Sequence, residues 1–226
     1  MSTNAQEGGN VMSVVTIWGG RGSGAPEVGK QVAEKLQADY VDREIIARVA
    51  ARLHREEQEV IRKEMLPSSL LARIVEALGH SDSFGEGFEG AYLRISEMPL
   101  DDARYLQALK SVVRELARSQ RIVILGRGSQ FILKDYPEVL HVLIVAPLQL
   151  RVNCVMKDSN LDQETAEREV ARSDNSIREF MKRYFRSEPE DPEHYDLVIN
   201  TEHLSFQAAA SIAVDALSLK NKTVDK

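Results

Sequence analysis

A glycine-rich stretch between an apolar run and a helical pattern, from Val14 to Leu36, places the strongest constraint on the fold. Residues 14–17 form a short apolar, β-branched run, and five glycines fall among residues 19–29. From Pro26 onward the apolar residues recur at three- and four-residue steps, at Val28, Val32, Ala33 and Leu36. A strand, a glycine turn and a helix start form the layout of a phosphate-binding loop, since glycines admit an anion and the helix N-terminus favours negative charge. A glycine-rich turn that binds nothing would have the same pattern.

Two alignments of this stretch with the phosphate-loop motif G-x-x-x-x-G-K-[ST] compete. Residues 24–30 fit it formally, but Gln31 replaces the Ser or Thr that would contact magnesium, and Lys30 falls inside the expected helix. The other alignment takes residues 19–24 as the loop, which then begins at the strand end and lets the helix start near Pro26. We prefer it because the motif needs a strand before it and a helix after it. Ala25 then stands where the phosphate-binding lysine would be.

Composition and charge narrow the class of protein. The chain has 226 residues, of which 43% are hydrophobic and 28% charged, so we expect one globular domain over residues 13–220, preceded by a disordered tail at 1–12. The net charge of −6 argues against nonspecific nucleic-acid binding. No run approaches the length of a membrane span. The single cysteine, Cys154, lies in an apolar run, so we expect it to be buried and the protein to be cytoplasmic.

Short apolar runs alternate with helical patterns along the rest of the chain. We expect further strands ending at Val41 and spanning 121–125, 139–145 and 197–200. Asp42, Asp162 and Ser205 are placed to cap the helices that follow them. Near-continuous apolar strands that alternate with helices predict an α/β fold with a five-stranded parallel sheet covered on both faces. Residues 80–100 mix glycine, serine and acid with three aromatics, and a loop of this length is often functional.

Ligands of open α/β sheets bind beyond the carboxyl ends of the strands. The glycine loop, Asp42 and Arg127 all follow predicted strands, so we expect them to meet at that edge. Arg127 stands between Gly126 and Gly128, which leave room for a ligand, and its guanidinium can bind a phosphate bidentately. A structural ion pair with a carboxylate is the alternative role for this arginine.

A second set of charged residues lies on a long predicted helix, at Arg172, Asp174, Arg178 and Arg183. Phosphoryl transfer needs several positive groups around the migrating phosphate, and these arginines would supply them. A solvated helix face explains them almost as well. The five histidines are scattered without metal-ligand spacing, so none is assigned to zinc.

These pieces together resemble the cytidylate kinase-like family of the P-loop nucleoside monophosphate kinases. The resemblance extends from about residue 14 to 217 and rests on GSGAPEVGKQVAEKL, YVDREII, VILGRGSQFIL, VLHVLIVAPLQLRV, RSDNSIREFMKRYF and YDLVINTEHLS. It implies a three-layer P-loop kinase-like fold, ATP and Mg²⁺, a helical substrate-binding region within 43–118 and a lid near 158–192.

Carried over position by position, the resemblance implies three groups of site residues. The ATP phosphates would be cradled by Gly19, Gly20, Arg21, Gly22, Ser23, Gly24 and Ala25. The acceptor would face Asp42, Arg48, Asp174 and Arg127, the last of which would hold its phosphate. Arg127, Arg172 and Arg178 would be the catalytic cations, the last two in the lid.

The chain also departs from the family pattern. Cytidylate kinases carry lysine and Thr or Ser where this chain has Ala25 and Glu27, and aspartate where it has Gly128. Glu27 would either hold magnesium or repel a triphosphate. We therefore expect a kinase that moves the ATP γ-phosphate to CMP, dCMP or a similar small acceptor. A nucleotide-binding regulatory protein with weak transfer and a kinase of a non-nucleotide small molecule remain alternatives. Neither a membrane nor a nucleic-acid partner is expected, and a homo-oligomer is left open.

Overall fold

The structure is a computed structural model that describes residues 13–42, 44–53, 55, 57, 60, 102–119 and 121–224. The tail at 1–12, the loop at 80–100 and much of the expected substrate-binding region lie outside the described residues. Within them, five parallel strands form one sheet in the order β2-β3-β1-β4-β5. Their bounds are β1 Ser13–Gly19, β2 Asp39–Val41, β3 Arg121–Leu125, β4 Leu140–Val145 and β5 Leu197–Asn200.

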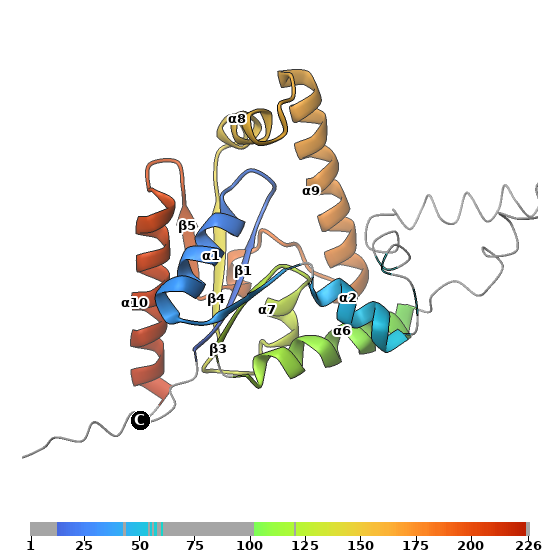
Figure 1. The fold of residues 1–226 in the computed structure, drawn as a ribbon, viewed down its shortest axis with the longest axis vertical. Coiled ribbons are helices and arrows are strands. Elements are labelled where there is room, and N and C mark those ends of the chain that lie inside the picture. The colour runs from blue at the N-terminus through green and yellow to red at the C-terminus, as the bar shows by residue number, and fades with distance from the viewer. Residues whose placement is uncertain are drawn as a thin grey trace, which may run out of the picture.

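The helices cover both faces of this sheet, as Figure 1 shows. α1 (Ala25–Leu36) and α10 (Phe206–Val224) pack together on one face. α2 (Glu44–Leu53), α6 (Asp102–Ala117) and the short α7 (Ser129–Ile132) lie on the other. α8 (Leu148–Ser159) and the long α9 (Gln163–Phe185) pack against each other beyond the end of β4, and a short 3-10 helix, η1 (Pro192–His194), precedes β5.

The central strand β1 explains why the core has two halves. Its side chains alternate between faces, so Val15 and Ile17 pack with α1 and α10, whereas Val14 and Trp18 pack with α2, α6 and α9. All four side chains are buried because helices cover both faces of the sheet. The predicted α/β fold with a five-stranded parallel sheet is therefore confirmed.

Most predicted element bounds agree with the structure to within a few residues. Asp162 caps α9, accepting a hydrogen bond from the Thr165 N–H at 2.9 Å, and the Ser205 hydroxyl accepts from the Ala208 N–H at 3.1 Å. Asp42 differs, because α2 begins at Glu44, two residues later. Asp42 therefore lies one residue before the position that would cap α2. Its own N–H donates a hydrogen bond to the Glu44 carboxylate at 3.1 Å. No helix within the described residues is long and apolar enough to span a membrane.

Candidate functional site

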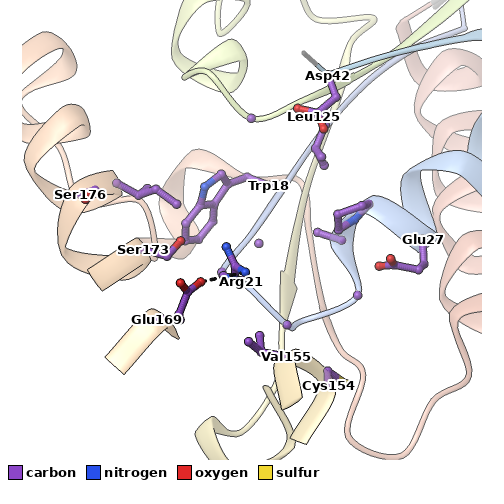
Figure 2. A pocket seen from close by; sticks show the side chains of 18 of the residues that line it. Trp18, Arg21, Glu27, Asp42, Leu125, Cys154, Val155, Glu169, Ser173 and Ser176 are labelled. Carbon is purple, nitrogen blue, oxygen red and sulfur yellow. Dashed lines mark ion pairs between the residues drawn. The ribbon is translucent and has the colours of Figure 1, made fainter. Parts of the chain in front are cut away.

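A cavity of about 760 Å³ opens beyond the carboxyl ends of β1 and β3. The glycine loop, the β3–α7 turn, α8 and α9 contribute to its walls (Figure 2). Ten residues that the sequence predicted for the site line it: Gly19, Gly20, Arg21, Gly22, Gly24, Ala25, Glu27, Asp42, Arg127 and Arg172. Ser23, Arg48, Asp174 and Arg178 were predicted too, but they do not line it. Within the described part of the chain, the residues at the strand ends therefore converge as expected.

The glycine loop has the geometry of the preferred alignment. β1 ends at Gly19 and α1 begins at Ala25, so the turn occupies residues 20–24. Gly22 and Gly24 have φ angles of 82° and 84°, a left-handed conformation that glycine adopts without strain. Lys30 lies on the exposed side of α1, beyond the first helical turn. The competing alignment, which would use Lys30 as the loop lysine, is therefore wrong.

Residues in the C-terminal part of the chain contact the glycine loop and hold it in place. The Thr201 hydroxyl donates a hydrogen bond to the Ser23 carbonyl at 2.9 Å, and the Ser23 side chain is buried. A Cβ on Gly24 would lie only 2.2 Å from the Phe206 ring, so this glycine also allows α10 to pack against the loop. Thr201 belongs to the YDLVINT segment, and holding the loop is the structural role of its last residue.

Arg151 of α8 supports the loop from the side of α9. Its Nε donates to the Arg21 carbonyl at 2.8 Å, and its two terminal nitrogens donate to the Asp174 carboxylate at 3.0 and 2.7 Å. A Cβ on Gly20 would lie 2.5 Å from the Arg151 guanidinium, which shows how closely the two pack. Asp174 is thus an ion-pair partner of Arg151 in this structure, a pairing that no pattern in the sequence indicated.

The turn after β3 holds Arg127 in an unusual backbone conformation. Gly126, Arg127 and Gly128 have φ angles of 69°, 58° and 67°, and a non-glycine residue in this left-handed region carries strain. The Gly126 N–H donates to the Ile17 carbonyl at 2.9 Å, which fixes the turn beside β1. A Cβ on Gly128 would lie 2.2 Å from the Phe185 ring. The aspartate of the family pattern is therefore excluded at position 128 unless Phe185 moves.

The charged residues of α9 divide between two environments. Glu169 points into the cavity, where its carboxylate lies 2.9 Å from Arg21 and 3.4 Å from Arg172 (Figure 2). Arg178 instead forms a 2.9 Å ion pair with Glu190 beyond the end of α9. The predicted lid cations are thus separated, since Arg172 lines the cavity and Arg178 does not.

Two carboxylates line the cavity away from α9, and one of them belongs to Glu27, the predicted magnesium ligand. Glu27, in the first turn of α1, and Asp42, after β2, both line the cavity. Both also act on Tyr40, whose pKa is raised well above its ordinary value by burial and then by the negative charges of Asp42, Glu27 and Glu44. No group of three metal-binding side chains occurs among the described residues. Mg²⁺ usually takes one or two carboxylates together with substrate phosphates, so these two cavity-lining side chains are the candidates for a magnesium site.

Sequence reasoning missed several residues of the site, among them Trp18, Glu169, Phe206 and Arg151. Trp18 and Glu169 line the cavity, Phe206 lines it beside Gly24, and Arg151 supports the loop. The position of Trp18 directly after an apolar run was the one usable signal, because the end of a strand lies at the ligand edge and Trp18 is the second-last residue of β1. Cys154 was expected to be buried, but it is half-exposed and lines the cavity as well.

Comparison with known proteins agrees with this fold. Residues 14–203 match the model of the cytidylate kinase-like family. An uncharacterised protein from Eubacterium ventriosum is similar in structure, with a TM-score of 0.65 at 18% identity over 92% of this chain and 99% of that one. A shikimate kinase from Acinetobacter baumannii, solved with shikimate, gives a TM-score of 0.49 at 16% identity over 94% and 96% of the two chains.

One curated relative is similar over a part of the chain. The uronate isomerase of Corynebacterium glutamicum is 31% identical over 98 residues, which are 43% of this chain and 19% of the relative. This chain therefore matches about a fifth of the length of that protein. The family match extends over most of the chain, from β1 to the residues after β5. The protein belongs to the cytidylate kinase-like family.

Proposed function

We propose that this protein transfers the γ-phosphate of ATP to CMP, dCMP or a similar small acceptor. The observation that carries the proposal is the cavity in which the glycine loop and Arg127 face a common space. A loop at a helix N-terminus suits the phosphates of the donor, and an arginine on a second strand end suits the phosphate of the acceptor. Transfer requires both groups to be held at one site.

The side chains around the cavity have separate roles in this proposal. The loop at 20–24 binds the triphosphate, and Arg127 holds and orients the acceptor. Arg172 of α9 neutralises charge on the phosphate being transferred, as phosphoryl transfer relies on positioning and on positive groups. Trp18 and Phe180 give the cavity an apolar wall that excludes water and would contact the non-phosphate part of a ligand.

Glu27 and Asp42 are the residues that would hold Mg²⁺ in this site. The ion would neutralise phosphate charge, with most of its remaining ligands supplied by the phosphates and by water. The pKa of the Tyr40 hydroxyl is raised first by burial and then by the negative charges of Asp42, Glu27 and Glu44. This local excess of negative charge is consistent with a cation partner.

A regulatory protein that binds nucleotide but transfers phosphate weakly is the second candidate. It is favoured by Ala25, which is buried at the start of α1 in the position of the loop lysine. A kinase of a non-nucleotide acceptor is the third, since the fold alone does not fix the substrate.

ADP formation from ATP and Mg²⁺ over a panel of nucleoside monophosphates and small alcohols separates these candidates. We expect turnover with a pyrimidine monophosphate and its loss in Arg127→Gln. Arg121→Gln is the matched control, because Arg121 is exposed at the opposite end of β3. Nucleotide binding with no turnover on any acceptor would favour the regulatory protein. Turnover on an alcohol alone would favour the third candidate.

A further inference from the structure

The glycine loop lacks the positive charge that usually accompanies it. Ala25 occupies the position of the lysine, and its side chain is buried against the neighbouring loop residues. Lys30 lies further along α1, outside the cavity. Arg21 is the basic residue within the loop itself, and its side chain lines the cavity. Within the loop, the Arg21 guanidinium is therefore the group that can supply positive charge to a bound triphosphate.

The Arg21 guanidinium already holds an anion. Its Nη2 lies 2.9 Å from Oε2 of Glu169, and Nη2 of Arg172 lies 3.4 Å from Oε1 of the same carboxylate. One carboxylate on the cavity wall thus lies near two guanidinium groups, and Figure 2 shows Glu169 directed from α9 toward the loop. Guanidinium groups bind carboxylate and phosphate oxygens in the same way, so a phosphate can take the place of Glu169.

The backbone of Arg21 stays fixed while its side chain is able to change partners. The Arg21 carbonyl accepts the hydrogen bond from Arg151, whose ion pair with Asp174 leaves 13% of each side chain exposed. The Arg21–Glu169 pair is more open, with 42% and 28% of the two side chains exposed. Exposed ion pairs contribute little stability, so exchanging Glu169 for a phosphate costs little.

We propose that the Arg21 side chain is the phosphate ligand that replaces the missing loop lysine, and that Glu169 occupies its anion position until a nucleotide phosphate displaces it. The inference rests on the proposed ATP site and adds two roles to it. Arg21 contacts the phosphates directly. Glu169 competes with them, both by holding Arg21 and Arg172 and by placing a negative charge in the cavity.

The test is the binding of Mg²⁺-ADP and of inorganic tripolyphosphate, measured by calorimetry on the full chain. Arg21→Gln should weaken both by about 10–150-fold, the range for a hydrogen bond to a charged group. Arg21→Lys should recover part of this loss. Glu169→Gln should bind both probes about fivefold more tightly or better, because a like charge has been removed from the site.

Glu164→Gln is the matched control for Glu169→Gln. It removes the same charge from the same helix, at a residue that pairs with Arg168 outside the cavity. We expect its affinity for both probes to equal that of the parent. Glu169→Ala provides a second variant that also removes the charge, and thermal unfolding of each variant shows that it is folded.

Three outcomes would overturn the inference. In the first, Arg21→Gln binds like the parent. In the second, Glu169→Gln binds equally or more weakly, which would make Glu169 a support of the loop. In the third, neither the parent nor any variant binds either probe, and the nucleotide site is then wrong as well. Failure of the proposed transfer appears separately, as absence of ADP formation in a protein that binds these probes.

Discussion

Arg151 and Asp174 form a bidentate ion pair that connects α8 to α9 directly behind the glycine loop. Both side chains are mostly buried, and the remaining contact of the guanidinium is the Arg21 carbonyl of the loop. Arg151 therefore links the position of α9 to the shape of the loop, in addition to the more exposed Arg21–Glu169 ion pair.

Asp174→Ala should destabilise the protein by about 2–4 kcal/mol, since it leaves the charge of Arg151 largely buried without its partner. Glu190→Ala is the matched comparison, because it removes a carboxylate from the exposed pair with Arg178 and should cost less than about 1 kcal/mol. Urea unfolding at neutral pH measures both values. Equal losses in the two variants would mean that the Arg151–Asp174 pair has no special role.

The conformation of Arg127 allows its functional and structural roles to be separated. Arg127→Gly relieves a strained φ of 58°, whereas Arg127→Ala keeps the strain, so the alanine variant should be less stable than the glycine variant by about 1 kcal/mol. Both should weaken acceptor binding or transfer by about 10–150-fold. Melting temperatures and acceptor titrations give the two readouts. A large loss of stability with normal acceptor affinity would instead identify Arg127 as a structural ion-pair residue.

His141 should make the stability depend on pH. Burial lowers the pKa of its imidazole from 6.5 to about 4; the Asp196 carboxylate opposes the shift and Lys220 adds to it. Between pH 6.5 and about 4, the unfolded chain binds a proton at His141, whereas the folded protein keeps this imidazole neutral. The stabilisation is therefore complete above pH 6.5 and decreases as the pH falls toward 4, by about 3 kcal/mol in total.

The pH prediction is checked by urea unfolding between pH 7 and 4.5, comparing the parent with His141→Asn. The Thr16 hydroxyl lies 2.7 Å from Nδ1 of His141, so the variant will lose some stability at every pH, and the slope is the quantity to compare. His203→Asn is the control, because this histidine is 88% exposed. If His141→Asn keeps the full slope of the parent, another group is responsible.

Cys154 offers a direct measure of cavity occupancy, as it is the one cysteine in the chain and lines the cavity. Its pKa is raised, first by burial and then by the Asp158 carboxylate, so its thiol should react slowly with a disulfide reagent. Saturating ADP with Mg²⁺ should slow the reaction further by covering the thiol. Identical rates with and without the nucleotide would show that the ligand does not fill this cavity.

The fold was largely predictable because its signals are local. The β-branched runs at 121–125 and 197–200 and the caps Asp162 and Ser205 act over a few residues, and the structure has them where the pattern predicts. The loop and Arg127 were predictable for a related reason. The carboxyl ends of parallel strands meet at one edge, so residues that follow strands approach each other in any fold of this class.

The residues contributed by the long helix could not be predicted in the same way. Helical spacing indicates that Glu169, Ser173 and Ser176 share a face, but it does not say that this face lines the cavity. That depends on how α9 packs against Tyr105 and Phe131 through its aromatic residues. Arg151 was missed because its partners lie 130 residues earlier and 23 residues later in the sequence.

The order of the strands has a consequence for how the site forms during synthesis. β1 is central, and its two partners begin with Arg121 and Leu140, more than a hundred residues further along. The Ser23 carbonyl accepts its hydrogen bond from Thr201, later still. The glycine loop thus leaves the ribosome early but reaches its final shape only when β5 and α10 have followed. A chain interrupted before Thr201 would contain every loop glycine and still lack the hydrogen bond that holds the loop at Ser23.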